Sequence, residues 1–344
     1  MAVRWLSTDG RLRIIRADDD TGARQGASQG RTHRWVHQNE NRYHPGNCTG
    51  GMDAGGFLGL LLAAAPPTTV VAVDGVLCDI ARTLLQEQGR VTCLVAPGAN
   101  PHDLLLRGAD RQALGTAGLV LINGHNLTPA MNRVRVGVPV VAVGERAVPR
   151  NKALDPHVWH DPAFAGAMVQ ETAKAVQPLL GNAHAGALQR RRQAMQAVLT
   201  RLGAWSGQQV QTVPEAHRVL VSEHRAFAAF ASRYGIRELP VIDTFATGGP
   251  LRPSSLAAIT EAVRKSGTKA IFAESLPPSK TLRRISSASG VAIAKRPLYA
   301  DGQAPGQSLV ETATTNVCTF VTAQGGRCDQ QAAAALQQQW AAIR

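Results

Sequence analysis

Aromatic residues make up only 4% of this 344-residue chain, and no run of about 18 or more apolar residues occurs. The missing run excludes an internal transmembrane helix, because a helix needs roughly 20 apolar residues to cross a bilayer. Apolar residues still account for 44% of the chain, mainly as Ala, Val and Leu. This usage predicts a soluble α/β protein with a large core and many small contacts between helices and sheet.

Acidic residues are also scarce, with 24 Asp and Glu against 37 Lys and Arg, a net charge of +13. A nucleic-acid site would gather these basic residues and place aromatic residues between them. Here they are scattered, and the densest run, Arg190-Arg191-Arg192, lies in a helical pattern typical of a solvated helix face. We therefore expect no nucleic-acid partner.

The chain has five cysteines, and none of them has the C-x-x-C spacing of a zinc knuckle or a redox motif. Cys48 lies in an atypical N-terminal segment, and the other four form two pairs that are close in sequence. We predict disulfides between Cys78 and Cys93 and between Cys318 and Cys328, as in a protein of an oxidising compartment. Spacing alone leaves the connectivity open.

Residues 1–51 contain eight arginines, no lysine and no sustained apolar period, so we expect no stable structure there. The apolar run 57–65 has the length of a signal-peptide core and ends in small residues, although a short buried helix is an alternative. Residues 1–66 are thus interpreted as a disordered or non-native segment with a signal-peptide-like stretch. Export to the periplasm follows, and membrane association stays open.

From Thr69 onward, β-branched runs alternate with helical patterns, which predicts parallel strands with right-handed crossovers. A long helical stretch divides two such series and ends before Pro214. The helices of the first series are expected at 78–88, at about 110–114 and in a stretch ending near residue 136. The predicted strands are 70–73, 91–95, 119–123 and 140–143, then 219–222, 241–243, 270–273 and 291–294, and the long helical stretch covers 163–180 and 183–210.

The predicted fold is α/β, with two lobes that each contain a four-stranded parallel sheet flanked by helices. The N-terminal lobe should span 67–180, a single long rigid backbone helix should span 181–214, and the C-terminal lobe should span 215–344. One packed helix between lobes predicts little closure, whereas flexible crossovers would predict a large movement.

Four polar residues follow the carboxyl ends of predicted strands, where open parallel sheets place their binding groups. They are His102, His157, His224 and Asp301. Any one of them alone would more often be a capped turn or a satisfied polar residue. Two from each lobe at the same edge predict a site between the lobes.

His157 lies in the stretch 155–162, which holds two histidines, two aspartates and two prolines. Prolines restrict the backbone, so the histidines should lie on a stiff loop, as suits a metal ligand. The alternative is a turn that starts a helix, with Asp161 as N-cap and Pro162 in the first turn.

Five segments of the chain, spread over roughly residues 69–325, resemble in order and spacing the motifs of the zinc- and manganese-binding proteins of ABC transporters. The resemblance implies two lobes joined by a rigid helix, and a monomeric carrier, not an enzyme. It also implies one divalent ion between the lobes, handed to a membrane permease, with His102, His157, His224 and Asp301 as ligands. The segments are 97–102, 155–162, 222–227 with 234–235, 272–275 and 297–301.

Two departures from that family pattern are visible. His160 stands where the family usually has an apolar residue, and no long His-rich acidic loop precedes Asp155. We expect His160 to lie behind the ligands or exposed, so that His160→Ala changes little, with direct ligation by His160 or His125 as alternatives. Glu274, at another strand end, is expected to orient a ligand histidine.

Three imidazoles and one carboxylate suit Zn²⁺, whereas a site richer in oxygen would favour Mn²⁺, which remains the alternative cargo. A zinc hydrolase is a rival interpretation and needs an open coordination position. A carrier of a chelated metal, haem or corrinoid is a second rival and would need a broad aromatic or basic cleft. The scarcity of aromatics argues against the second rival.

Overall fold

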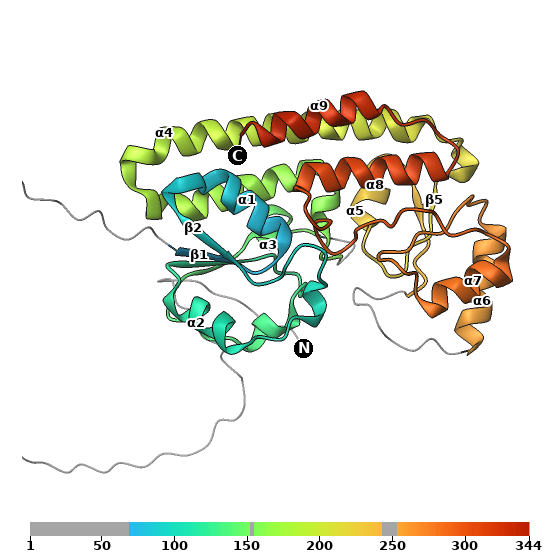
Figure 1. Ribbon diagram of the computed structural model, residues 1–344, viewed down its shortest axis with the longest axis horizontal. Coiled ribbons are helices and arrows are strands. Elements are labelled where there is room, and N and C mark those ends of the chain that lie inside the picture. The colour runs from blue at the N-terminus through green and yellow to red at the C-terminus, as the bar shows by residue number, and fades with distance from the viewer. Residues whose placement is uncertain (1–68, 152–154, 243–252, 344) are drawn as a thin grey trace, which may run out of the picture. The chain divides into compact units, whose positions relative to one another are not determined.

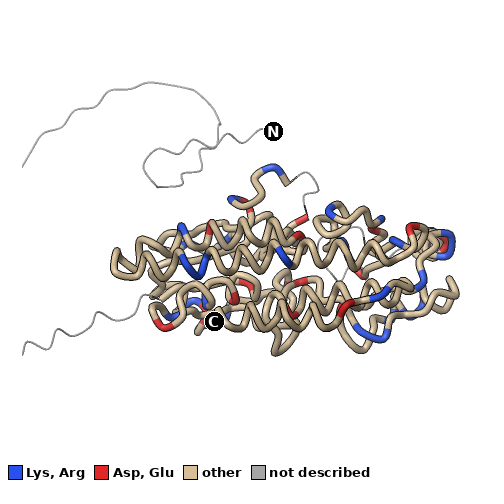
Figure 2. Tube along the Cα trace, turned by 90° about the horizontal axis from the view of Figure 1, so that it is seen from above, with Lys and Arg blue, Asp and Glu red and all other residues tan. Residues whose placement is uncertain are grey.

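The computed structural model describes residues 69–151, 155–242 and 253–343. The expectations for residues 1–66 and for Cys48 therefore lie outside the described residues. Within the described part, no helix is long and apolar enough to cross a membrane. Lys and Arg are distributed over several elements and interspersed with Asp and Glu (Figure 2).

Four parallel strands form the first sheet, in the order β2-β1-β3-β4 (Figure 1). Their side chains alternate between two buried clusters, because successive residues of a strand point to opposite faces. Val70 and Ala72 join the cluster that includes α1 and α4, whereas Val71 and Val73 join the cluster that includes Leu114. The strands are β1 (Thr69–Ala72), β2 (Arg90–Cys93), β3 (Leu119–Ile122) and β4 (Val140–Ala142), close to their predicted positions.

The helices of this lobe are α1 (Gly75–Leu85), α2 (Gly108–Thr116) and α3 (Val143–Ala147). Asp74 caps α1 by accepting a hydrogen bond from the backbone N of Leu77 at 2.9 Å. The helix expected to end near residue 136 is shorter than predicted, a 3₁₀ helix η3 (Pro129–Arg133). His125 and Asn126, which precede it, have left-handed φ angles of 50° and 60°. A right-handed helix cannot include residues with such angles, so η3 begins after them.

The longest helix, α4 (Pro162–Gln211), begins at the predicted cap, since Asp161 Oδ1 accepts from the backbone N of Ala163 at 2.8 Å. Gly181 interrupts it with a φ of 66°, which confirms the break expected between 180 and 183. Helix α4 packs against α1, α3, α8 (Leu309–Ala323) and α9 (Gln330–Ala341). It therefore contacts elements of both chain halves along its length, as Figure 1 shows.

The second lobe follows the same plan, but its regular sheet has two strands among the described residues, and the predicted strands at 241–243, 270–273 and 291–294 take part through isolated bridges. Strand β5 (Val219–Leu220) pairs in parallel with β6 (Arg237–Glu238), and parallel bridges join His224 to Ile242 and Ile271 to Ile293. Backbone bonds continue between these segments, for example from Phe272 N to Val221 O at 2.8 Å. The helices are α5 (Ala228–Tyr234), α6 (Pro253–Lys265) and α7 (Lys280–Ser289).

The two predicted disulfides are present. Cys78 of α1 is bonded to Cys93 of β2, with a Cα–Cα distance of 5.6 Å. Cys318 of α8 is bonded to Cys328 in the segment before α9, with a Cα–Cα distance of 5.2 Å. Each bridge therefore ties a helix to the chain segment next to it.

Candidate metal centre

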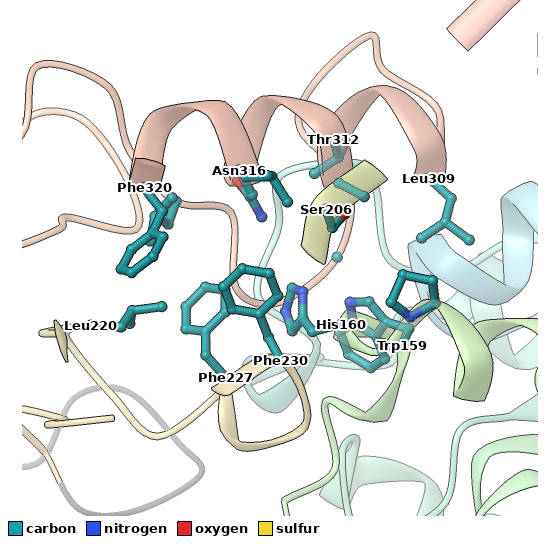
Figure 3. A pocket seen from close by; sticks show the side chains of 15 residues that line it. Trp159, His160, Ser206, Leu220, Phe227, Phe230, Leu309, Thr312, Asn316 and Phe320 are labelled. Carbon is teal, nitrogen blue, oxygen red and sulfur yellow. The ribbon is translucent and has the colours of Figure 1, made fainter. Parts of the chain in front are cut away.

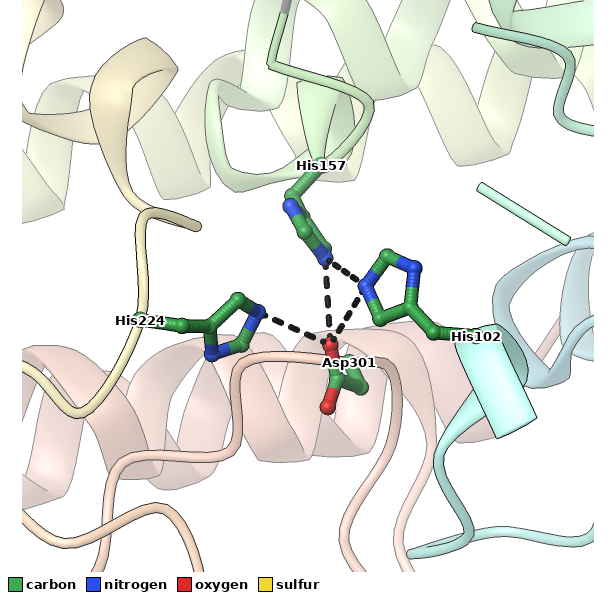
Figure 4. Close-up of side chains that lie close together, drawn as sticks. All are labelled: His102, His157, His224 and Asp301. Atoms are coloured by element: carbon green, nitrogen blue, oxygen red, sulfur yellow. Dashed lines mark hydrogen bonds and ion pairs between the residues drawn. The ribbon is translucent and has the colours of Figure 1, made fainter. Parts of the chain in front are cut away.

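The four predicted ligand residues come together from four separate chain segments. His102 lies on the 3₁₀ helix η2 (Pro101–Asp103), His157 directly before η4 (Val158–His160), His224 just after β5, and Asp301 in the loop before α8. One potential ligand atom of each lies within 4.8 Å of those of the others. Figure 4 shows the three imidazoles converging on the carboxylate of Asp301.

The distances fit a small tetrahedral ion. Nε2 of His157 lies 3.1 Å from Nε2 of His102 and 3.1 Å from Oδ1 of Asp301. The same Oδ1 lies 3.3 Å from Nε2 of His102 and 3.3 Å from Nε2 of His224. Bonds of about 2.0–2.1 Å to a tetrahedral ion would separate its ligand atoms by roughly 3.3 Å. The side chains of His157 and His224 are 0% exposed, and that of His102 is 3% exposed.

Asp155 holds His157 at two points. Its Oδ1 accepts from the backbone N of His157 at 2.9 Å and lies 2.7 Å from Nδ1 of the ring. Its other oxygen accepts from the backbone N of Ala228 at 3.0 Å, at the start of α5. Because Nδ1 donates to this carboxylate, Nε2 is the nitrogen left for an ion. Asn123, at the end of β3, fixes the same loop by donating to Pro156 O at 2.9 Å.

Glu274 holds His224 in the same way from the second lobe, as the sequence predicted. Its Oε1 accepts from the backbone N of His224 at 3.0 Å, and its Oε2 lies 2.6 Å from Nδ1. Nε2 of His224 is buried and has no hydrogen-bond partner, although Oδ1 of Asp301 is close enough for an ion pair. A buried nitrogen aimed into the cluster without a hydrogen bond fits an ion that would occupy that place.

The loop that carries Asp301 is fixed on both sides of the carboxylate. Asn316 of α8 accepts from the backbone N of Tyr299 at 3.0 Å and donates to its O at 2.8 Å. Thr312 accepts from the backbone N of Ala304 at 3.0 Å. From the first lobe, the backbone N of Gly98 donates to Gln303 O at 2.8 Å. Asp301 is thus presented to the histidines by a loop with little freedom to move.

The histidines and carboxylates of the cluster shift one another's pKa values toward the charged forms. Burial alone would disfavour a charged imidazole, but the carboxylates of Asp301 and Glu274 outweigh it and raise the pKa of His224 to about 10. The pKa of His157 is raised in the same way against burial, by Asp155 and Asp301. The three histidines hold the pKa of Asp301 well below its usual range, although burial opposes this. The site therefore attracts cations, and protons compete for the same nitrogens.

Two other histidines lie outside this group. His125 donates its backbone N to Oε1 of Glu145 at 2.7 Å and is no member of the four-residue cluster. His160 lies behind the site, where its Nε2 is 2.8 Å from Ala300 O. Sequence reasoning missed the roles of Asp155 and Asn123. The position of Asp155 two residues before a ligand histidine was the available signal.

Comparisons with known proteins agree with this geometry. The family model described as zinc-uptake complex component A, periplasmic (ZnuA), matches residues 70–323. The chain belongs to this family. Members of the ZnuA family are periplasmic, metal-binding solute-binding proteins. The chain is accordingly a metal-binding, substrate-binding component of an ABC transporter, with a divalent metal ion as cargo.

Relatives within the wider family are named for different metals. The zinc-binding protein TroA of Treponema pallidum is 30% identical over 237 residues, covering 66% of this chain and 76% of TroA. The manganese-binding lipoprotein MntA of Bacillus subtilis is 28% identical over 229 residues, covering 63% of this chain and 74% of MntA. The iron-binding protein YfeA of Yersinia pestis is 24% identical over 233 residues, covering 64% of this chain and 74% of YfeA.

Solved structures confirm the fold. The periplasmic zinc-binding protein TroA superimposes with a TM-score of 0.70 at 27% identity, over 76% of this chain and 100% of TroA. Fe(III)-bound YtgA of Chlamydia trachomatis also gives a TM-score of 0.70, at 22% identity, over 76% of this chain and 99% of YtgA. The plan of helix-flanked parallel sheets with one long helix is thus that of the ZnuA family.

Proposed function

We propose that this ZnuA-family protein captures one Zn²⁺ ion through His102, His157, His224 and Asp301 and delivers it to a membrane ABC permease for import. The observation that carries the proposal is the closed set of four ligand atoms, with separations of 3.1–3.3 Å around Asp301. Two ligand residues come from each predicted lobe. Carboxylates behind His157 and His224 fix the tautomer that leaves Nε2 available.

Zinc is favoured over manganese and iron by the donor set. Three neutral imidazole nitrogens with one carboxylate oxygen are borderline-soft ligands, which suit zinc, whereas manganese prefers a site richer in oxygen. The relatives named for zinc, manganese and iron share the family, so the choice rests on the ligands of this chain. Manganese remains the second candidate.

A zinc hydrolase is less well supported. Such an enzyme keeps one coordination position open for water and places a general base beside it. Here Oδ1 of Asp301 lies 3.1–3.3 Å from Nε2 of all three histidines, which fits a fourth ligand better than a base. A haem or corrinoid carrier is disfavoured because the site is enclosed, with histidine side chains 0–3% exposed.

The proposed setting is extracytoplasmic. Two disulfides fit an oxidising compartment, and the family description is periplasmic. We propose a monomeric carrier whose partner is the membrane permease, without a nucleic-acid partner and without a chemical reaction on the metal. The predicted lobe boundaries, 67–180, 181–214 and 215–344, belong to the same proposal.

Elemental analysis of the protein isolated from its own compartment tests the proposal most directly, and we expect one zinc per chain. A competition titration of the purified protein should give tighter binding of Zn²⁺ than of Mn²⁺. His157→Ala should remove most of the affinity, whereas His125→Ala, outside the cluster, should not. If His125→Ala abolished binding while His157→Ala did not, the ligand assignment would be wrong.

A second variant tests the choice of metal. His224→Glu replaces a nitrogen donor by an oxygen donor, so we expect it to lower the ratio of zinc to manganese affinity. The matched control is His184→Glu, because His184 is exposed on α4 and outside the cluster. An unchanged ratio in His224→Glu would exclude His224 from the metal's ligands.

A further inference from the structure

His160 joins the start of α4 to the loop that carries Asp301. Its Nε2 lies 2.8 Å from the carbonyl oxygen of Ala300, the residue directly before Asp301. A carbonyl oxygen can only accept, so Nε2 carries the proton and donates it. The bond spans 140 residues of sequence, from the η4 turn to the end of the second βα series. Figure 3 shows His160 between Trp159 and the Phe227 side chain, facing α8.

Packing fixes the imidazole of His160 in place. Its ring centroid lies 5.4 Å from that of Trp159 and 4.6 Å from that of Phe227. Beside these rings is a cavity of about 30 Å³, roughly room for a single water. The neighbouring rings therefore keep Nε2 directed at the carbonyl oxygen of Ala300.

The other bonds of the Asp301 loop define what the His160 bond adds. Asn316 and Thr312, both on α8, hold Tyr299 and Ala304 from the same half of the chain as the loop. Gly98 of the first half donates to Gln303, two residues after Asp301, whereas His160 donates to Ala300, directly before it. His160 belongs to the segment that also carries His157, three residues earlier. The bond from His160 to Ala300 therefore fixes Asp301 relative to His157, which faces it across the site.

We propose that His160 is a positioning residue, which sets the distance between Asp301 and the three histidines and so raises the affinity of the site for its metal. The inference rests on the proposed function. It replaces the expectation that His160→Ala changes little. No ligation by His160 is involved, because His160 is not one of the four residues whose ligand atoms converge and its Nε2 is bonded to Ala300.

His160→Phe is the informative variant, because it keeps an aromatic ring between Trp159 and Phe227 and removes only the donor. We expect zinc affinity to fall about three- to tenfold, as for the loss of a typical hydrogen bond. His160→Gln, whose amide can donate from a similar place, should recover part of the loss. Competition titration with a zinc chelator gives the affinities, and the melting temperature of each metal-free variant reports on folding.

A double-mutant cycle separates positioning from general packing. In an Asp301→Asn background the ligand oxygen is weakened, so His160→Phe should change zinc affinity by a factor close to one. The same three- to tenfold loss in both backgrounds would show that His160 acts on packing and not through Asp301, and would overturn the inference. So would an unchanged affinity of His160→Phe in the otherwise natural chain. A natural chain that binds no zinc would instead refute the proposed function.

Discussion

At the scale of residues, the two best-buried histidines of the site are held by the same pair of hydrogen bonds. In each case one carboxylate accepts both the backbone N–H and the ring Nδ1–H of the histidine: Asp155 for His157 and Glu274 for His224. Two bonds from one carboxylate fix both the ring's orientation and its tautomer. The ring therefore offers Nε2 to the site before any ion arrives, which reduces the ordering needed on binding.

Asp155→Ala should weaken zinc binding by about 10- to 100-fold, the usual range for loss of a partner behind a metal-ligand histidine. The variant also leaves the backbone N of Ala228 without its acceptor, so the metal-free protein should melt at a lower temperature. Competition titration and thermal unfolding measure the two effects. Glu261→Ala is the control, because Glu261 is 44% exposed and pairs with Arg264 on the surface. Equal zinc affinity of the two variants would contradict this role of Asp155.

Zinc affinity should rise with pH between about 5.5 and 8. The folded-state pKa of His224 is raised to about 10, and that of His157 is also raised, so an ion must displace protons from them. Each proton displaced makes the affinity change by about tenfold per pH unit. Titrations in buffers that do not coordinate zinc measure the slope. A slope near zero would mean that the ligand nitrogens are already unprotonated in the metal-free protein.

The same pKa shifts should make the fold of the metal-free protein less stable as pH rises, whereas zinc affinity increases. A histidine whose folded pKa is raised above its unfolded value of about 6.5 stabilises the fold fully below that value and loses this contribution as pH rises toward 10. The free energy of unfolding of the metal-free protein should therefore fall over this window. The difference in melting temperature between the zinc-loaded and metal-free protein should grow with pH.

At the scale of elements, each disulfide joins a helix to the chain segment that packs beside it. Cys78–Cys93 joins α1 to the edge strand β2, and Cys318–Cys328 joins α8 to the segment before α9. Their loops span 15 and 10 residues. In the chain-entropy model, each closure is worth about 3 kcal/mol.

Replacing Cys78 and Cys93 together by alanine should lower the free energy of unfolding by about 3 kcal/mol. Urea unfolding under non-reducing conditions measures the loss. The natural protein with its disulfides reduced is the matched control and should lose at least as much. Free thiols at all four cysteines of the exported protein, found by mass mapping, would remove the basis of this prediction.

Much of the element order could be predicted from sequence, for identifiable reasons. The β-branched runs around Val70 and Val120 are buried on both faces, so they show as short apolar stretches between turns. The break predicted between 180 and 183 in the long helical stretch coincides with Gly181, the residue with non-helical backbone angles inside α4. Strand β5 lies within the predicted 219–222, but β6 (Arg237–Glu238) was missed, because a two-residue strand of Arg and Glu has no β-branched or apolar signal. Beside it, Leu239 N and Val241 N donate to Leu220 O and Ser222 O, so Pro240 lies between them where no donor is needed.

The candidate site was predictable to the level of its four polar residues, because strand ends and motif spacing place them. Its supporting bonds were not. Asn123 reaches Pro156, and His160 reaches Ala300, over 33 and 140 residues. Such bonds depend on the packing of whole elements and leave no local pattern in the sequence.

At the scale of the whole described chain, the two halves are joined at several places besides α4. Oδ2 of Asp79, buried on α1, accepts from the backbone N of Leu309 at 2.9 Å and from Nε1 of Trp340 at 3.1 Å. Gly98 N donates to Gln303 O, as described above, from the loop after β2. These bonds connect the first sheet's segment to α8, α9 and the Asp301 loop. A hinge motion would have to break them, which makes a large closure costly.

Zinc binding should therefore stabilise the protein strongly while changing its dimensions little. An ion bound to residues from both halves favours the folded state by mass action, by about 4 kcal/mol when free zinc is 1,000 times the dissociation constant. Small-angle scattering of the metal-free and zinc-loaded forms should give the same radius of gyration within error, although the melting temperature rises. Asp79→Ala removes an acceptor that joins α1 to α8 and α9. In this variant, the radii of gyration of the metal-free and zinc-loaded forms should differ more than in the natural protein. A clear decrease in radius of gyration when the natural protein binds zinc would show that the halves move apart in its absence. The bonds of Asp79 and His160 would then describe only the closed state.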